Sequence, residues 1–350
     1  MKNSKKSVMH MLGMSILLSM SSASFAELVV DASKGTGQAA LNWSSEDANQ
    51  LLNGDVSSSA EEVSPQGSTK ITTSVRSSNG VAQHSAPKTV QVLNNSNYSN
   101  QPSVNARAAL VMDGQTGEVL FSKNSNTAYP IASITKLMTA VVISDSRLNM
   151  SEKITLQQSD FSCSGCKSSS STLRAGDSMN RAEALLVALM KSENPAASAL
   201  ARTFPGGRAA FISAMNAKAR ALGMNSTHYM ESTGLHPGNV SSARDLGILV
   251  NTASQYGLIR QFSTTPSYDF NLGYRVLKSN NTNALVRNGG WNINISKTGY
   301  INEAGRCVVM HTTLNNRPAV VVLLGADSSA ARTNDATRLM SWVSNLPKRI

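Results

Sequence analysis

Two groups of apolar segments stand far apart in this chain, and together they constrain its fold more than any other feature. Residues 108–113 and 118–122 flank a turn and predict a β-hairpin. Three further strands are predicted near the C-terminus, at residues 294–300, 307–314 and 318–325. A tight Asn-Asn-Arg turn joins the last two, so they are antiparallel. Since mainly helical patterns separate the two groups, we expect one sheet built from both ends of an α/β domain.

Several segments of the intervening region have the apolar spacing of helices. One apolar helix begins near Ser133 and continues through residues 137–143, and Pro195 opens another at its preferred first position. Ser242, followed by Asp245 three residues later, has the form of a capping box. The other predicted helices cover residues 181–191, 209–222 and 330–346.

Residues 1–26 have the features of a secretory signal peptide. Lysines precede an apolar stretch, and a Ser-Phe-Ala sequence ending at Ala26 forms a small-x-small cleavage site. The stretch is too short to span a bilayer as a stable helix. No cysteine lies near the cleavage site, so a lipid anchor is not expected. We therefore expect export to the periplasm and no stable membrane anchor; the alternative is a retained N-terminal anchor.

Residues 27–104 are rich in Ser, Asn, Gln, Thr and Gly and contain few large apolar side chains. Such a composition cannot bury enough surface to offset its chain entropy, which predicts a low-complexity flexible tether. The alternative is a partner-binding segment that orders on contact, with the apolar cluster Leu41, Trp43, Leu51 and Leu52. Residues 105–350 then form the folded domain.

The formal net charge of +11 belongs to that domain. The three lysines of residues 1–26 cancel the net −3 of the tether, so residues 105–350 carry the whole excess. A basic domain suits an anionic polymer or a carboxylate-bearing ligand. We expect no nucleic acid partner, because no stacking pattern or groove-reading helix is present and the chain is expected to be exported. On charge alone, ordinary solvated lysines are the simplest interpretation.

Three cysteines lie in a chain that we expect to reach a compartment where disulfides persist. Cys163 and Cys166 are either a local disulfide or two free thiols. Zinc would need four ligands, and the remaining His and Cys residues lack a matching pair, so no metal or other cofactor is expected. Cys307 starts an apolar strand, and we expect it to be a small buried hydrophobe.

Three short motifs carry the candidate chemistry: Ser133-Ile134-Thr135-Lys136, Ser192-Glu193-Asn194 and Lys297-Thr298-Gly299. Ser133 and Lys136 stand at i and i+3 at a helix start, so their side chains share one face. A serine is a weak nucleophile until a base takes its proton. Burial and a second cation, here Lys297, would both lower the pKa of Lys136 and make it that base. The five histidines lie in unrelated contexts, so no Ser-His-Asp triad is indicated.

The other motif residues suit the same chemistry. Ser192 is expected to relay a proton to a leaving amine, and Asn194 to orient the lysine and hold a substrate amide. Lys297 and Thr298 are expected to bind a carboxylate. Gly299 has no side chain, which lets a substrate backbone lie along its strand. Each motif alone is common, but together they predict an acyl-serine enzyme.

The motif set is similar to the S-x-x-K, S-x-N and K-T-G set of the penicillin-interacting serine enzymes. From about Arg107 to its C-terminus, the chain resembles the low-molecular-mass penicillin-binding proteins of the D-alanyl-D-alanine carboxypeptidase type. The segments that match that family's pattern are 133–139, 233–235 and 241–245. Two further segments, 281–288 and 296–306, resemble its D-alanyl-D-alanine endopeptidase branch.

The resemblance implies a fold, a site and partners. The fold is the penicillin-binding, β-lactamase-like transpeptidase fold, an antiparallel five-stranded sheet flanked by helices. The backbone N–H groups of Ser133 and Tyr300 would form the oxyanion hole, and Arg332 would be a further carboxylate partner. Peptidoglycan stem peptides would be the substrates, and β-lactam antibiotics the covalent inhibitors.

Three outcomes compete for the acyl-serine: cleavage of D-alanyl–diamino-acid cross-links, trimming of D-Ala from pentapeptides, or destruction of β-lactams. Efficient β-lactam hydrolysis needs a second base in an E-x-x-L-N stretch, and residues 231–235 have the wrong spacing and no Asn. The branch-like segments and the short ending after Gly299, without room for an appended β-domain and anchor, favour a D,D-endopeptidase over a carboxypeptidase. A non-enzymatic wall-binding module is the remaining alternative.

Two departures from the family's pattern concern the expected cleft mouth. Pro195 follows S-x-N where a basic residue is common in the endopeptidase branch, and residues 163–171 look like an insertion in a hairpin that the family keeps shorter. Both bear on substrate preference rather than on acyl transfer.

Overall fold

The computed structural model describes residues 27–28, 71–72 and 100–347. The predicted signal peptide, and the predicted tether apart from these residues, lie outside this part of the chain. The first two segments form a short antiparallel pair, β1 (Glu27–Leu28) with β2 (Ile71–Thr72). None of the helices in the described residues is long and apolar enough to cross a membrane.

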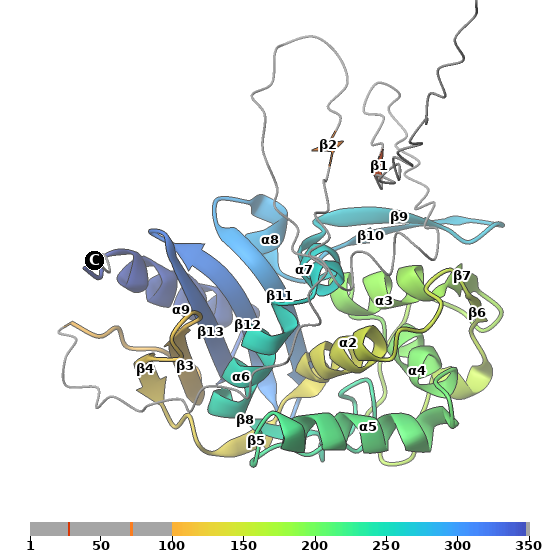
Figure 1. Ribbon diagram of the computed structural model, residues 1–350, viewed down its shortest axis with the longest axis horizontal. Helices are drawn as coiled ribbons and strands as arrows, with labels where there is room; N and C mark the ends of the chain where they lie inside the picture. Colours follow the sequence, from red (N-terminus) through yellow and green to blue (C-terminus); the bar gives the residue numbers. More distant parts are fainter. Residues whose placement is uncertain (1–26, 29–70, 73–99, 348–350) are drawn as a thin grey trace, which may run out of the picture.

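A five-stranded antiparallel sheet frames the domain, in the order β11-β12-β13-β3-β4. Its strands are β3 (Ala108–Asp113), β4 (Val119–Lys123), β11 (Asn292–Ile301), β12 (Gly305–Leu314) and β13 (Arg317–Ala326). The two ends of the domain meet where β13 pairs with β3, with Val322 opposite Leu110. This confirms the sheet expected from the sequence, and Figure 1 shows the gold and blue strands side by side.

The central strands are apolar because both faces of the sheet are covered. Residues 319–326 of β13 are all buried, and so is the whole of β3. Asn315 and Asn316 join β12 to β13 with φ angles of 49° and 63°, the left-handed conformation that a tight hairpin turn requires. The strand pattern and its turn therefore agree.

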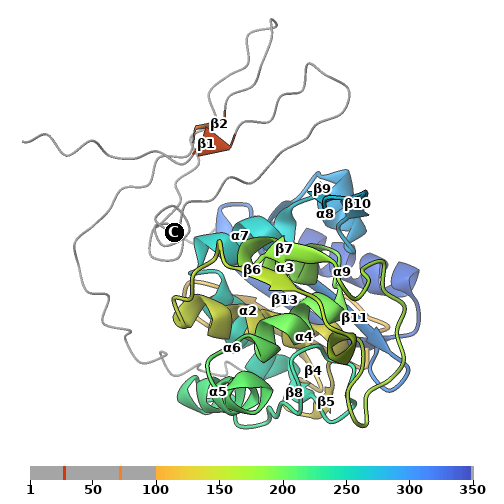
Figure 2. The ribbon, with the colours of Figure 1, turned by 90° about the vertical axis from the view of Figure 1, so that its right-hand side faces the viewer.

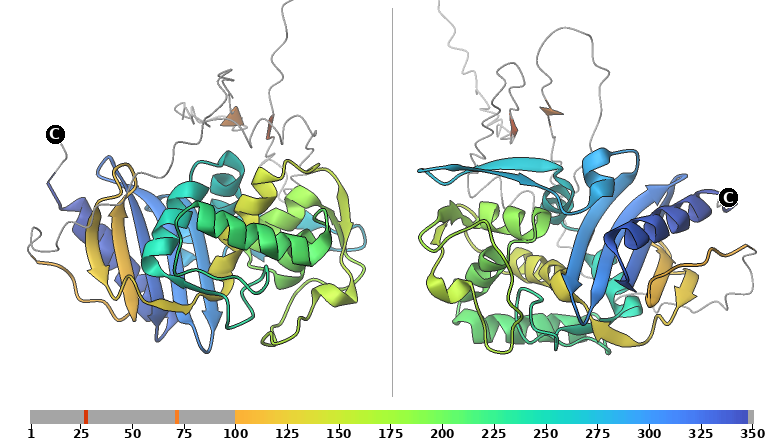
Figure 3. Two further views of the ribbon diagram at one scale, coloured as in Figure 1. Left: turned by 60° about the horizontal axis from the view of Figure 1, so that its bottom comes forward. Right: turned by 180° about the vertical axis from the view of Figure 1, so that it is seen from behind.

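Helices pack on both faces of the sheet. On one face, α9 (Ser329–Ser344) packs against β12 and β13, and the rear view of Figure 3 shows this helix in front of the sheet. Its Leu339, Met340 and Val343 are buried in the hydrophobic cluster on this face. The same cluster includes Val104, at the end of the predicted tether. The opposite face carries α6 (Ala243–Ala253), with Ser242 capping its first turn through the Asp245 amide. Figure 2 looks onto the helical side of the domain.

The remaining helices are α2 (Thr135–Asp145), α3 (Arg181–Met190), α4 (Asn194–Arg202), α5 (Gly207–Ala221), α7 (Gly257–Thr264) and α8 (Ala284–Asn288), with 3₁₀ turns η2 (Ala132–Ile134) and η3 (Gln158–Asp160). Short strand pairs join β5 (Ala128–Pro130) to β8 (Val240–Ser242), β6 (Lys153–Thr155) to β7 (Ser178–Asn180), and β9 (Ser267–Asn271) to β10 (Val276–Asn280). The segment between β6 and β7 contains residues 163–172, which we call the inserted loop.

Candidate active site

The three motifs meet where the edge strand β11 passes the 3₁₀ turn η2. Ser133 lies in η2, directly before α2, so the nucleophile stands in a 3₁₀ turn rather than in the first α-helical turn. In the described residues β11 has only one strand neighbour, β12. Its Gly299 lies so close to η2 that a Cβ there would be 3.0 Å from the Ser133 amide nitrogen. A sheet edge in this position can accept an extended peptide as an added strand.

Lys136 is the nearest basic group to the nucleophile. Its Nζ lies 3.0 Å from Ser133 Oγ, and it donates to Asn194 Oδ1 at 2.6 Å and to the Thr233 carbonyl at 2.7 Å. The lysine side chain is completely buried. Burial lowers its pKa to about 7, against the opposing effects of the Glu231 and Glu193 carboxylates. A large fraction of this amine is therefore neutral near pH 7 and able to take the serine proton.

Ser192 and Lys297 form a second, adjacent pair. Lys297 is buried and donates to Ser192 Oγ at 2.8 Å and to the Thr298 carbonyl at 2.9 Å. Burial holds its pKa well below the usual lysine value, and repulsion from Lys136 and Arg332 lowers it further. The repulsion expected from the sequence thus acts on the pKa of Lys297, while burial accounts for that of Lys136.

Ser192 also has an unusual backbone. Its φ of 67° lies in the left-handed region, which costs a non-glycine residue about 1–3 kcal/mol at strained functional sites. This conformation follows the end of α3 and precedes α4, and it brings the hydroxyl to the lysine on β11. No sequence pattern indicated it.

Asn194 connects the catalytic lysine to the inserted loop. Its Oδ1 accepts from Lys136, as expected, while its Nδ2 donates to Ser169 Oγ at 2.8 Å. Asn194 is the first residue of α4, one residue before the start at Pro195 that the sequence predicted. The helix start therefore fixes its backbone, and its side chain is held from both sides.

Thr298 and Tyr300 continue the site along β11. The Thr298 hydroxyl donates to Thr282 Oγ1 at 2.7 Å, a partner that the sequence did not indicate. The Tyr300 side chain is 47% exposed, with the Arg306 guanidinium 3.5 Å from its ring centroid. The Tyr300 hydroxyl donates to Asn302 Oδ1 at 2.7 Å, so the candidate role of Tyr300 stays with its backbone N–H.

Arg332 lies near the start of α9, close enough to β11 for its charge to act on Lys297. It is 8% exposed, and its charge helps to lower the pKa of Lys297. Burial lowers its own pKa, and repulsion from Arg306 and Arg287 adds to the effect. Several cations thus surround the K-T-G strand, as a site for a carboxylate requires.

Two glutamates, the buried Glu193 and the half-buried Glu231, hold the loops around the site, a role that the sequence did not indicate. Glu193, the middle residue of S-x-N, accepts hydrogen bonds from Ser171 Oγ at 2.5 Å and Thr172 Oγ1 at 2.6 Å, and so anchors the inserted loop. Glu231 accepts from the amides of Thr233 and Gly234 at 2.5 and 2.6 Å. Because backbone donors hold its oxygens, Glu231 shapes the loop that carries the Thr233 carbonyl. The only signal in the sequence was the acidic residue at the middle of S-x-N, which is Glu193.

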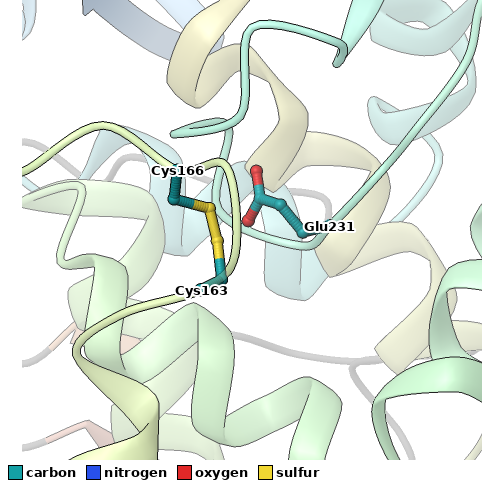
Figure 4. Close-up of side chains that lie close together, drawn as sticks. All are labelled: Cys163, Cys166 and Glu231. Carbon is teal, nitrogen blue, oxygen red and sulfur yellow. A yellow bond between two sulfur atoms is a disulfide. The ribbon is translucent and has the colours of Figure 1, made fainter.

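The inserted loop is closed by a disulfide between Cys163 and Cys166, one of the two states that the sequence left open. Figure 4 shows it beside the Glu231 carboxylate; the sulfurs and a carboxylate oxygen lie within 4.8 Å of one another. Because the sulfurs are bonded to each other, this group offers no thiolates for a metal. Cys307 is buried, as predicted.

A cavity of about 490 Å³ lies under this loop. Asn194 and Thr233, two of the groups that hold Lys136, contribute to its wall beside Cys163 and Phe161. The loop therefore covers one side of the candidate site.

Comparison with known proteins gives this geometry a context. A family model described as D-alanyl-D-alanine carboxypeptidase matches residues 95–328. The chain is 46% identical over 250 residues to a D-alanyl-D-alanine endopeptidase of Pseudomonas aeruginosa, covering 69% of this chain and 78% of the relative. It is 42% identical over 260 residues to a D-alanyl-D-alanine endopeptidase of Escherichia coli, covering 74% and 83%. The crystal structure of a Streptomyces DD-transpeptidase is 29% identical, with a TM-score of 0.64 over 69% of this chain and 98% of that one.

Proposed function

The chain belongs to the D-alanyl-D-alanine carboxypeptidase family of serine peptidases, and from this membership we propose that it is a serine D,D-endopeptidase cleaving D-alanyl–diamino-acid cross-links in peptidoglycan. One observation carries the chemistry: a fully buried lysine amine, with its pKa lowered to about 7, lies 3.0 Å from the Ser133 hydroxyl. The endopeptidase preference is supported by the two relatives above, which both bear that name.

Acylation begins with Lys136 as the base. The neutral amine takes the proton of Ser133, and Ser133 Oγ attacks the carbonyl carbon of the D-alanine. The backbone N–H groups of Ser133 and Tyr300 stabilise the oxyanion. The leaving amine takes a proton passed on through Ser192, whose hydroxyl Lys297 contacts at 2.8 Å. Water then releases the acyl group and regenerates the serine.

The remaining motif residues hold the substrate. Lys297 and Thr298, supported by Arg332, bind the carboxylate beside the scissile bond, and Asn194 binds a substrate amide while it orients Lys136. Gly299 leaves room for the peptide along β11. This same carboxylate site accepts β-lactam antibiotics, which acylate Ser133 and act as covalent inhibitors.

The cellular setting is part of the proposal. We take residues 1–26 as the signal peptide, residues 27–104 as the tether and residues 105–350 as the serine D,D-peptidase domain. The enzyme then works in the periplasm, where it remodels the cell wall and thereby influences cell shape.

The test is chromatography of peptidoglycan fragments digested by the purified protein. We expect cross-linked dimers to be split into monomers faster than D-Ala is released from pentapeptides. Accumulation of free D-Ala while dimers persist would identify a carboxypeptidase. Ser133→Ala is the control: it should stay folded, cleave neither substrate, and lose the penicillin adduct that mass spectrometry places on the Ser133 peptide. An adduct on Ser192 would overturn the assignment of the nucleophile.

A further inference from the structure

An ion pair joins the two walls of the candidate cleft. Lys167, in the inserted loop, places its Nζ 2.5 Å from Oε1 of Glu303, in the turn between β11 and β12. The two side chains are 48% and 36% exposed. Their contact is the only ion pair between the inserted loop and that turn among the described residues. The ion pair is therefore accessible, so charged groups of a substrate could bind Lys167 and Glu303 in place of their contact with each other.

The pair lies close to the nucleophile on both sides. The Lys167 amide donates to the Leu235 carbonyl at 3.0 Å, and the preceding Gly234 packs so tightly that a Cβ there would collide with the Ala132 carbonyl oxygen. On the other wall, Glu303 follows Tyr300 by three residues. The ion pair thus lies at the end of the cleft, next to η2 and just after the end of β11.

The direction of a bound peptide follows from the cations on β11. Its carboxylate lies toward Lys297 and its scissile carbonyl lies at Ser133 and Tyr300, so the rest of the stem continues along β11 toward the turn at Glu303. The stem residue that precedes the D-alanine is therefore the one that reaches Lys167 and Glu303. This step rests on the proposed function.

Both charged groups have bonding capacity left for a ligand. Oε2 of Glu303 is covered and has no hydrogen-bond partner in the described part of the chain, although Oε1 is paired. An ammonium has three donors. The ammonium of Lys167 has Glu303 as its ion-pair partner and can donate to a ligand as well. A carboxylate oxygen left without a donor loses a stabilising interaction. Because the Glu303 side chain as a whole is 36% exposed, its carboxylate can bind a ligand ammonium in place of Lys167.

Both groups are also held in position by their backbones. The Cys163–Cys166 disulfide closes the turn directly before Lys167, and the Gly165 backbone packs against the His236 ring. On the opposite wall, the Arg107 guanidinium donates to the Glu303 and Ala304 carbonyls at 3.0 and 2.6 Å. Such preorganisation reduces the entropy lost when a ligand is bound.

We propose that Lys167 and Glu303 form a subsite for a zwitterionic side chain, that of a diamino dicarboxylic acid in the stem. The free carboxylate of this side chain binds Lys167, and its free ammonium binds Glu303, so two ion pairs replace one. A lysine side chain would satisfy Glu303 but leave Lys167 without its partner. An amidated side chain would offer Lys167 no charge.

The experiment compares three stem substrates that differ only at this residue: the diamino dicarboxylic acid, its side-chain carboxamide, and lysine. For each, kcat/KM for D-alanyl bond cleavage is measured with the full chain, and so is the protection that the corresponding free stem tripeptide gives against penicillin labelling. The wild type should favour the zwitterion about tenfold over the carboxamide, the size expected for one charge-assisted hydrogen bond. Lys167→Met should remove this preference. Glu303→Gln removes the partner of the ammonium that all three side chains carry, so it should lower kcat/KM for all three substrates and weaken the protection by all three tripeptides.

The decisive variant is the double exchange Lys167→Glu with Glu303→Lys, which keeps an ion pair across the cleft but reverses its direction. The kcat/KM of this double variant for the zwitterion should be as low as that of Lys167→Met. The control is Lys153→Met, which removes an exposed lysine on β6 and should keep the wild-type preference. If the double exchange fully recovers the wild-type preference for the zwitterion, the ion pair only holds the two walls together, and the proposed subsite is wrong. Equal protection by all three tripeptides would overturn it too. If no stem is cleaved while the tripeptides still protect selectively, the proposed function fails and the subsite stands.

Discussion

The two sides of the candidate cleft are built in opposite ways. On one side, Ser133, Lys136 and Lys297 stand on η2, α2 and β11, and both lysines are fully buried. On the other side, residues 163–172 form a loop that is mostly exposed and contains no helix or strand. Side-chain hydrogen bonds to Glu193 and Asn194 and one disulfide hold this loop.

The difference separates chemistry from substrate choice. Burial sets the pKa of Lys136, so the reactivity of Ser133 depends on packing that a change at the surface reaches only indirectly. The inserted loop contributes groups such as Lys167 whose partners are within reach of solvent. Variants of the buried side should therefore act on all acylating compounds, and variants of the loop on peptides alone.

The largest effect should come from the base. In Lys136→Arg the guanidinium cannot lose its proton, so penicillin acylation should fall by roughly 10³-fold or more. In the wild type Lys136 works only when neutral, so the acylation rate should rise tenfold per pH unit below about 7 and level off above it. Stopped-flow or mass-spectrometric acylation rates between pH 5 and 9 measure both effects. An active Arg variant, or a rate that falls with rising pH, would mean that another group accepts the serine proton.

A smaller effect should come from the contact between β11 and η2. A Cβ in Gly299→Ala would lie 3.0 Å from the Ile131 carbonyl oxygen and the Ser133 amide, which are backbone atoms and cannot rotate away. The 3₁₀ turn must shift, and with it one donor of the oxyanion hole. We expect penicillin acylation to fall about 10²-fold, close to the loss of one such donor.

The matched control for this variant is Gly223→Ala. Gly223 has a φ of 75° and nothing within 4 Å of the added Cβ, so it carries backbone strain without a clash. Its free energy of unfolding should fall by about 1–2 kcal/mol with an unchanged acylation rate. Equal acylation rates in the two variants would show that the approach of Gly299 to η2 has no catalytic importance.

The sheet and the motif positions could be predicted because each depends on local pattern. The apolar run of β13 and the paired asparagines before it mark a buried hairpin, whatever else surrounds them. Ser133 and Lys136 are three residues apart, so a helical turn brings them together without further information. The sequence also predicted that the two groups of strands share one sheet, whereas the pairing of β13 with β3 is known only from the structure.

The remaining features depend on contacts between distant residues. The hairpin of β9 and β10 went unpredicted, because its strands mix polar and apolar side chains without the alternation of a half-buried strand. Glu193 is the unspecified middle residue of S-x-N, and only the folded chain brings it to Ser171 and Thr172. The left-handed φ of Ser192 occurs between the end of α3 and the start of α4, and no residue type at that position reveals it.

The smallest effect on acylation should come from the loop itself. Replacing both cysteines, Cys163→Ser with Cys166→Ser, removes a cross-link that closes a very short loop, worth at most about 2 kcal/mol by the chain-entropy estimate. Because Asn194 and Glu193 still hold the loop, penicillin acylation should stay within about twofold of the wild type. The preference among stem peptides should fall several-fold, because the disulfide no longer fixes Cys166, the residue next to Lys167. Hydrogen exchange of residues 163–172 should become faster. Reduction of the wild type with a small thiol should reproduce these changes and leave the double variant unaffected. If acylation instead falls as far as in Gly299→Ala, the loop holds the nucleophile as well as the substrate, and the two sides of the cleft do not divide the work in this way.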